Sequence, residues 1–308
     1  MRSRPQIVIV GSANTDMVVK APRIPGPGET VIGGDFLMAA GGKGANQAVA
    51  AARLGARVTL VARLGTDMFG DQAIAGYQHE GIDTTYIVRD ADHPSGIALI
   101  SVDAQGENSI AVASGANAHL TPLDVDRASQ AIGEAHVLLV QLEVPLDAVR
   151  RAVTIAHDMG VRVILNPAPA REIAPPLLAQ VSIVTPNEHE VKVVVGEPDQ
   201  AHAIRRILDA GVETVLVTLG AQGVLWATRE TQILVRAFPV EAIDTTAAGD
   251  AFNGGLAYAL GRGLSMAEAI RYANAVAAIS VTRLGAQPSL PTGAEVAAFL
   301  AYRGQGSG

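Results

Sequence analysis

The sequence predicts an α/β fold in which a mostly parallel central sheet is flanked by helices and carries a small β-sheet lid. Short apolar runs, such as residues 7–11 and 137–142, alternate with amphipathic or alanine-rich segments. This alternation is typical of parallel strands joined by helices. Of the 308 residues, 49% are hydrophobic, which is enough for a large core. Although this length would also allow two domains, we expect residues 1–308 to form one α/β domain.

Buried strands are expected wherever a short apolar run is bounded by polar residues or glycine. These runs are residues 7–11, 58–62, 137–142, 161–166, 182–185 and 214–218. Helices are expected where apolar residues recur every three or four positions. These segments are residues 44–54, 69–80, 146–159, 188–194, 200–210, 250–260, 265–282 and 294–302. The tail, residues 304–308, is expected to be disordered.

Two stretches, residues 15–37 and 85–113, depart from this alternation. They contain strand-like segments without an obvious crossover helix, namely residues 17–20, 30–36, 86–88, 96–102 and 109–113. Strands that follow one another without a helix are usually antiparallel. We therefore expect these segments to form the lid, apart from the main sheet. The alternative is that they are extra edge strands of the main sheet.

The composition excludes several classes of function. With 23 basic and 30 acidic residues, the net charge is −7, whereas nucleic-acid binding requires a basic surface. The sequence contains no block of like charge, so it does not predict binding to a membrane surface. The apolar run at residues 7–10 is too short for a signal peptide. Cysteine is absent, which excludes disulfides and thiolate catalysis. We expect a cytoplasmic protein whose partners are small molecules.

The strongest motif spans residues 243–255 and contains Asp-Thr-Thr-Ala-Ala-Gly-Asp. Ala247, Ala248 and Gly249 lie where the following helix begins, so free N–H groups and the positive end of the helix dipole favour an anion there. A phosphoryl group gathers negative charge during transfer and fits such a turn. Asp250, in the first helical turn, is placed to accept a proton from an attacking hydroxyl. The alternative is that Asp250 only caps the helix.

A second glycine turn, residues 40–48, also precedes a helix. It is not a Walker A loop, because Lys43 is followed by Gly44 rather than Ser or Thr. It is not a dinucleotide fingerprint either, because Gln47 stands where the last glycine belongs. Lys43 and Asn46 project from a glycine-rich turn that is suited to sugar hydroxyls. The alternative is a plain tight turn with a solvated lysine.

Polar residues follow two of the predicted strands. Asn14 and Asp16 come after the first strand and Glu143 after the strand at residues 137–142. Ligands of open α/β sheets bind at the carboxyl ends of strands. Each residue alone is more often a turn former or a helix cap. Together they predict a carboxylate- and amide-rich pocket for a neutral polyol.

Asn187 and Glu190 lie where another predicted strand meets a helix, and their spacing puts them on one helical face. A carboxylate and an amide there could hold a hydrated Mg²⁺ beside nucleotide phosphates. A capping box, with Glu190 reaching back to the chain at Asn187, explains the same pair. The sequence alone favours neither explanation.

These four segments, in their order along the chain, resemble the ribokinase family of carbohydrate kinases over residues 7 to about 300. The resemblance implies transfer of a phosphoryl group from ATP to the 5-hydroxyl of D-ribose. Deoxyribose, fructose and adenosine are the alternative acceptors within the family. A sugar-binding regulator without catalysis is the alternative of another class, and Asp250 argues against it. Family membership also implies a homodimer formed through the lid.

The resemblance assigns roles to individual residues. It makes Asp250 the catalytic base and Ala247, Ala248 and Gly249 the anion hole for the γ-phosphate. The implied ribose-binding residues are Asn14, Asp16, Gly42, Lys43, Asn46 and Glu143. The implied nucleotide contacts are Asn187, Thr218, Gly220, Gly223, Gly249 and Asn274. Glu190 is implied as the Mg²⁺-linked acid. The implied K⁺ site comprises Asp244, Thr246, Ser280, Arg283, Gly285 and Ser289.

Overall fold

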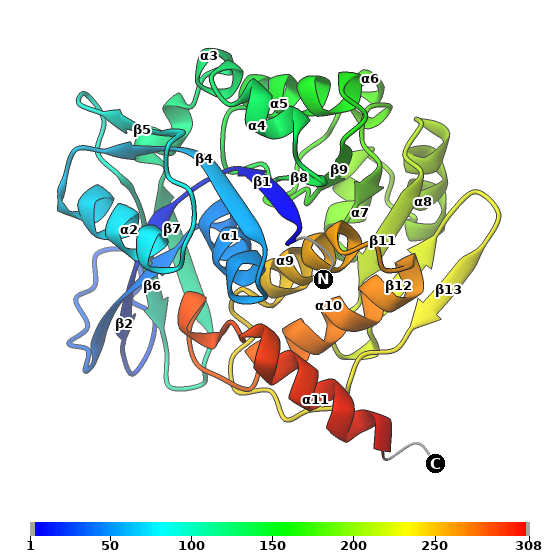
Figure 1. The fold of residues 1–308 in the computed structure, drawn as a ribbon. Helices are drawn as coiled ribbons and strands as arrows, with labels where there is room; N and C mark the ends of the chain where they lie inside the picture. Colours follow the sequence, from blue (N-terminus) through cyan, green and yellow to red (C-terminus); the bar gives the residue numbers. More distant parts are fainter. Residues whose placement is uncertain (1–3, 306–308) are drawn as a thin grey trace.

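A nine-stranded sheet crosses the centre of the computed structural model, which describes residues 4–305 (Figure 1). The strand order is β13-β12-β11-β10-β9-β8-β1-β4-β5. Seven strands are parallel: β1 (Gln6–Val10), β4 (Arg57–Gly65), β5 (Ile87–Asp90), β8 (Val137–Val140), β9 (Arg162–Leu165), β10 (Ile183–Val184) and β11 (Thr214–Thr218). The antiparallel hairpin of β12 (Val224–Ala227) and β13 (Gln232–Val235) completes one edge.

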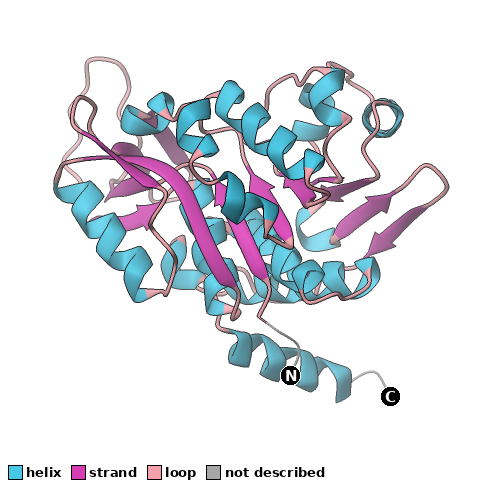
Figure 2. Cartoon of the chain, turned by 45° about the horizontal axis from the view of Figure 1, so that its top comes forward, coloured by secondary structure: helices cyan, strands magenta, loops and turns pink. Residues whose placement is uncertain are grey.

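Helices cover both faces of this sheet because its central strands are apolar on both sides (Figure 2). In β1, Val8 and Val10 contact one hydrophobic cluster, whereas Ile7 and Ile9 contact the other. The first cluster is covered by α3 (Pro122–Asp126), α4 (Ser129–Gly133), α5 (Leu146–Asp158), α6 (Pro175–Leu178), α7 (Glu190–Val194) and α8 (Gln200–Asp209). The second is covered by α1 (Lys43–Arg53), α2 (Met68–His79), α9 (Ala248–Gly261), α10 (Met266–Ser280) and α11 (Gly293–Gln305).

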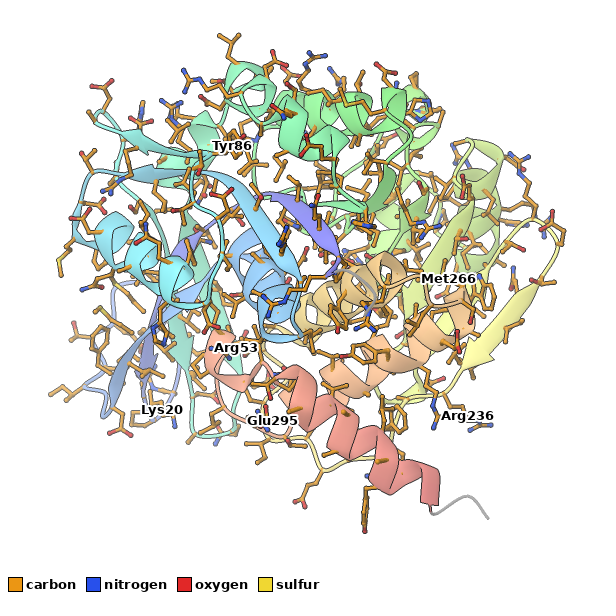
Figure 3. The ribbon with its side chains drawn as sticks, in the orientation of Figure 1. Lys20, Arg53, Tyr86, Arg236, Met266 and Glu295 are labelled. Carbon is orange, nitrogen blue, oxygen red and sulfur yellow. The ribbon has the colours of Figure 1, made fainter. Side chains whose placement is uncertain are left out.

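Helices α1 and α9, which carry the two glycine-rich motifs at their N-termini, pack closely against each other. The contact depends on small residues, because a Cβ on Gly254 of α9 would lie 2.5 Å from the Cβ of Ala50. At the other end of α1, Arg53 donates to the carbonyls of Gln287 and Leu290, which ties α1 to the segment that precedes α11 (Figure 3). The starts of α1 and α9 are therefore held together by packing along the helices.

A separate four-stranded sheet has the order β3-β2-β6-β7. Its strands are β2 (Asn14–Lys20), β3 (Phe36–Gly41), β6 (Gly96–Val102) and β7 (Asn108–Ala113). The β2–β6 pair is parallel and the other two pairs are antiparallel. Lys20 lies at the outer end of this sheet, away from the main sheet (Figure 3). Asn14 and Asp16, at the inner end of β2, lie beside Gly41 and Gly42 at the start of α1.

The predicted fold class is confirmed: the mostly parallel sheet is flanked by helices, and a small sheet lies apart from it. The six predicted central strands and eight predicted helices are present, with ends that differ by a few residues. Among residues 4–305, no helix is long and apolar enough to cross a membrane. Helix α11 continues to Gln305, so the first two residues of the predicted tail are helical. The remaining tail residues, 306–308, lie outside the described part of the chain.

Three details of the predicted sheets were wrong. The strand predicted at residues 86–88 is β5 (Ile87–Asp90) and belongs to the main sheet, because it follows α2 in a β4–α2–β5 unit and pairs in parallel with β4. The strand expected at residues 30–36 lies later, as β3, because prolines and glycines dominate residues 22–34 and disfavour a strand. The β12–β13 hairpin was not predicted.

Candidate functional site

Asp250 lies in the first turn of α9 and is buried, at 6% exposure. Its two carboxylate oxygens are held by two donors from α1. Asn46 Nδ2 donates to Oδ2 at 2.9 Å, and Gln47 Nε2 donates to Oδ1 at 2.9 Å. Among residues 4–305, no backbone N–H of α9 donates to this carboxylate, so Asp250 does not act as a helix cap. Its side chain instead faces the start of α1.

Burial raises the pKa of Asp250 to about 6. The charge of Lys43 and the hydrogen bonds from Asn46 and Gln47 oppose this rise, and the charge of Glu143 adds to it. The positive end of the α9 dipole would by itself lower this pKa, but the shift is upward. The cause is the loss of solvent, which outweighs the helix dipole. Asp250 is still mostly ionised at neutral pH, as a general base requires.

The charges of four carboxylates act on Lys43 at the start of α1. Burial favours the neutral amine, but the charges of Asp250, Glu143, Glu190 and Asp16 together raise the pKa of Lys43. Burial also raises the pKa of Asp16 to about 6, with Glu143 and Asp250 acting in the same direction and Lys43 against them. The motifs that the sequence singled out therefore meet in one electrostatically coupled cluster. Its excess of carboxylates suits a neutral substrate better than an anionic one.

Glu143 joins the loop after β1 to the glycine turn before α1. Its Oε2 accepts from Ser12 Oγ at 2.5 Å and from the backbone N–H of Lys43 at 3.0 Å. Gly42 has a φ of 87°, a conformation that glycine adopts at little cost. Its lack of a side chain also lets the turn approach the backbone of Asn14. Glu143 thus fixes the turn from which Lys43 projects.

Asn14 is oriented by Asn117, a buried residue that the sequence analysis did not identify. Asn117 Nδ2 donates to Asn14 Oδ1 at 2.8 Å and to the carbonyl of Ala13 at 3.0 Å. Its Oδ1 accepts from the N–H of Ala13. The Asn14 oxygen is therefore engaged, and its amide nitrogen is left to donate elsewhere. The available signal was the tripeptide Gly-Ala-Asn at residues 115–117, which repeats residues 44–46.

The turn before α9 has the geometry of an anion-binding turn. Ala247, the N-cap, has a φ of 59° in the left-handed region and no side-chain cap. The N–H groups at the start of the helix thus have no capping side chain. Asn253 Nδ2 donates to the Gly249 carbonyl at 2.8 Å and holds this turn from within the helix. Apart from its chain neighbours and the nearby backbone of α9, no described atom lies within 4 Å of the place where a Cβ of Gly249 would be, which leaves space for a ligand.

The predicted nucleotide contacts lie at the carboxyl end of β11 and on α10. The N–H of Thr218 donates to the carbonyl of Pro186, which brings the turn at residues 218–223 beside Asn187. Gly220 and Gly223 both have positive φ, 55° and 110°. Asn274 of α10 donates weakly to the carbonyls of Val235 and Arg236, at 3.4 and 3.3 Å.

Asn187 and Glu190 form the reciprocal hydrogen bonds of a capping box. The N–H of Asn187 donates to Glu190 Oε2, and Asn187 Oδ1 accepts from the N–H of Glu190. The same carboxylate contributes to the charge around Lys43, and burial raises its pKa. The two explanations that the sequence left open are therefore compatible, because the capping carboxylate also lies close to the cluster.

The residues assigned to a monovalent cation fall into three groups. Asp244 accepts from the N–H groups of Thr246 and Gly285, at 2.9 and 2.8 Å. Despite burial, these hydrogen bonds lower its pKa. The hydroxyls of Ser280 and Ser289 are 2.9 Å apart and buried. Arg283 instead pairs with Glu295 of α11 at 2.6 Å. The side chain of Arg283 is directed to an acid, so only its backbone carbonyl suits a cation.

Comparisons with known proteins agree with these motifs. The sequence profile described as pfkB family carbohydrate kinase matches residues 4–293. A ribokinase from Haemophilus influenzae is 45% identical over 304 residues, covering 97% of this chain and 99% of that protein. A deoxyribokinase from Salmonella typhi is 38% identical over 292 residues, covering 93% of this chain and 95% of that protein. The solved structure of an Arabidopsis thaliana ribokinase complexed with ribose and ATP has a TM-score of 0.89 at 32% identity, covering 97% and 99% of the two chains.

The resemblance drawn from the four sequence motifs is thereby confirmed over nearly the full length of the chain. Both the similarity in sequence and the shared fold extend through the small sheet as well as the main sheet. The chain belongs to the pfkB family of carbohydrate kinases.

Proposed function

We propose that this kinase transfers the γ-phosphoryl group of ATP to the 5-hydroxyl of D-ribose, giving D-ribose 5-phosphate and ADP. One observation carries the proposal: the first turn of α9 presents both a buried carboxylate, Asp250, and an open anion turn at residues 247–249. Base and anion site therefore lie within a few residues of each other. The similarity to proteins named ribokinase supports ribose as the acceptor.

The reaction follows from this arrangement. The 5-hydroxyl oxygen attacks the γ-phosphorus, its proton passes to the Asp250 carboxylate, and the bond from phosphorus to the bridging oxygen of ADP breaks. Negative charge on the transferring group is stabilised by the N–H groups of Ala248 and Gly249 and by the positive end of α9. Proton removal and charge stabilisation are thus supplied from one helical turn.

The polar ends that remain available around Asp250 suit sugar hydroxyls. Asn46 Oδ1 is buried and has no hydrogen-bond partner in the described chain, so a hydroxyl that donates to it would remove an unfavourable orphan acceptor. The Asn14 amide nitrogen is free to donate, since its oxygen is held by Asn117. Lys43 and Asp16 add one cation and one carboxylate. We assign these four residues, with Gly42 and Glu143, to the sugar.

ATP is expected to lie along the turn at residues 218–223, with Asn187 and Asn274 near it and its γ-phosphate at Gly249. Mg²⁺ would neutralise the phosphates and polarise the transferring group. Glu190 fits a link to a hydrated Mg²⁺, because a carboxylate oxygen is a preferred ligand. The charge that Glu190 exerts on Lys43 supports a position close to the reacting groups.

Another acceptor within the family is the main alternative, and the similarity to a deoxyribokinase gives it weight. A regulator without catalysis would have no use for a carboxylate held by two donors beside an anion turn. The test of the proposed function is an ADP-release assay of the purified protein with D-ribose. Turnover far above the sugar-free rate is expected, and ADP release that ignores D-ribose would contradict the proposal.

We also propose that K⁺ activates the enzyme through the segment around Asp244. Carboxylate, hydroxyl and carbonyl oxygens of Asp244, Thr246 and the loop at residues 280–289 are the hard ligands that K⁺ takes. Asp244 already joins the turn before α9 to Gly285, so a cation there would fix the anion turn. Since K⁺ is less strongly hydrated than Na⁺, turnover is expected to rise more with K⁺, and Asp244→Ala is expected to lose this response.

The matched control is Glu295→Gln, which breaks the neighbouring ion pair with Arg283 without touching Asp244. Its response to K⁺ is expected to match the parent enzyme. The measurement is initial velocity against K⁺ concentration in buffer free of other alkali ions. An unaltered rate on adding K⁺ to the parent enzyme would remove the proposal.

A homodimer formed through the small sheet is proposed from its exposed apolar face. The strand register places Val19, Phe36, Met38 and Leu99 on the face opposite Asp16. All four are more than a third exposed, and a contiguous apolar face of this kind is typical of an interface. Sedimentation is expected to give about twice the 31.7 kDa mass of one chain, and a monomer at micromolar concentration would contradict this.

A further inference from the structure

Gln47 of α1 is completely buried and hydrogen-bonded on three sides. Its Nε2 donates to Asp250 Oδ1 at 2.9 Å and to Asn166 Oδ1 at 3.1 Å. Its Oε1 accepts from Gln141 Nε2 at 2.5 Å. Both N–H groups of the amide are thus in use. A flipped amide would direct its oxygen at two acceptors, so the side chain has a single favourable orientation.

The direction of these hydrogen bonds matches an ionised Asp250. An ionised carboxylate only accepts, and each oxygen of Asp250 receives one donor, from Gln47 and from Asn46. One donor on each oxygen fixes the plane of the carboxylate and stabilises its charge. The charged groups that act on Asp250 from the other elements are Lys43 of α1, Glu143 after β8 and Asp16 of β2.

The same run of hydrogen bonds continues to the anion turn. Asn166 Nδ2 donates to the Thr185 carbonyl at 3.1 Å, and Thr185 Oγ1 donates to Asn253 Oδ1 at 2.6 Å. Asn253 in turn donates to the carbonyl of Gly249. Asn166 follows β9 and Thr185 follows β10, and all three residues are buried. Buried amides and a hydroxyl therefore connect the carboxylate with the turn at residues 247–249.

We propose that Gln47 is the positioning residue for Asp250: it fixes the carboxylate toward the acceptor hydroxyl and joins it, through Asn166, Thr185 and Asn253, to the anion turn. The inference rests on the proposed function only in taking Asp250 as the base. Gln47 acts on the reaction through Asp250 rather than on the substrate itself. Its loss is therefore expected to change kcat and its pH dependence more than substrate binding.

The test is Gln47→Met, which keeps the length of the side chain and removes all three hydrogen bonds. Because the charged carboxylate loses a donor, the acidic limb of the kcat profile is expected to move to higher pH by about half a unit or more. At the pH optimum, kcat is expected to fall about tenfold or more as the carboxylate loses its fixed plane. The KM values for D-ribose and ATP are expected to stay within about threefold.

The matched control is Gln141→Met, which breaks a hydrogen bond of the same buried network without contacting Asp250. Its melting temperature is expected to fall to a similar extent, while the acidic limb stays within about 0.2 pH unit of the parent. A purely structural role for Gln47 would give both variants the same small loss and the same acidic limb. That outcome would overturn the proposal.

A second readout does not depend on activity. Carboxyl ¹³C NMR of aspartate-labelled protein, with the Asp250 signal identified by Asp250→Asn, follows this titration directly. In Gln47→Met the Asp250 signal is expected to titrate at higher pH, and an unmoved titration would overturn the positioning role even if the enzyme is active. A moved titration without turnover of D-ribose would contradict the proposed function alone. If Gln47→Met fails to fold, Gln47→Leu takes its place, because it also removes the donor to Asp250 without adding a charge, and the same rise in the pKa of Asp250 is expected.

Discussion

Asp250→Asn is expected to lower kcat by about 10²–10⁴, which corresponds to about 3–5 kcal/mol of activation free energy. The substitution keeps the shape of the side chain but removes the proton acceptor. Sugar affinity, measured by calorimetry, is expected to stay within about tenfold, because the sugar retains its other hydrogen bonds. In the parent enzyme, kcat/KM is expected to be constant well above pH 6, to reach half its maximum near pH 6 and to fall further below it. The reason is that protonation at the raised pKa of Asp250, about 6, removes the base.

Glu268→Gln is the matched control for this prediction. Glu268 holds the same position in α10 that Asp250 holds in α9, and there it is a true capping residue that accepts from Ser265. Its substitution is expected to leave kcat within about twofold and to affect only stability. If Asp250→Asn also kept near-parental kcat, Asp250 would be structural and the mechanism would have to be abandoned.

Discrimination between acceptors is expected to be equally large. The proposed sugar site consists of amides, a lysine and carboxylates, which can hydrogen-bond to hydroxyls. Asn46 Oδ1 is a buried acceptor without a hydrogen-bond partner in the described chain. A substrate that lacks the matching hydroxyl leaves such a group unpaired, and sites of this kind reject the deficient analogue by roughly 10⁴. The kcat/KM for D-ribose is therefore expected to exceed that for 2-deoxyribose, fructose and adenosine.

Adenosine is the most informative competitor. A purine base requires an apolar or aromatic slot, and aromatic residues make up only 4% of the chain. Lys43 and the four carboxylates whose charges act on it offer the base no such surface. ADP release over a panel of pentoses, hexoses and nucleosides makes the comparison. A higher kcat/KM for adenosine would refute ribose as the acceptor while leaving the kinase assignment intact. A higher kcat/KM for 2-deoxyribose would instead make this sugar the acceptor, as the name of the Salmonella deoxyribokinase suggests for that relative.

Local pattern was sufficient to predict the central strands, the main helices and the turns that carry chemistry. Runs such as residues 137–142 are apolar on both faces, and only a covered parallel strand explains them. The anion turn could be predicted because glycine and small residues directly precede a helix. The roles proposed for Asp250 and Lys43 follow from these turns and from the family resemblance.

Contacts between distant segments could not be predicted in this way. Gln47 and Asp250 are 203 residues apart, and nothing in either motif indicates that they touch. Burial of Asp250 depends on the packing of α1 against α9, so the rise in its pKa could not be predicted from the motif alone. The place of β5 in the main sheet likewise depends on a register with β4 that short-range periodicity does not encode.

The most direct measurement is to identify the sugar product by ³¹P and ¹³C NMR after incubation of the purified enzyme with ATP, Mg²⁺, K⁺ and D-ribose. Phosphorus coupled to C5 of ribose is expected, in an amount equal to the ADP formed. With 5-deoxy-D-ribose, which lacks only the accepting hydroxyl, no sugar phosphate is expected. Phosphate on another carbon, phosphorylation of 5-deoxy-D-ribose, or ADP formed without any sugar phosphate would contradict transfer to the 5-hydroxyl.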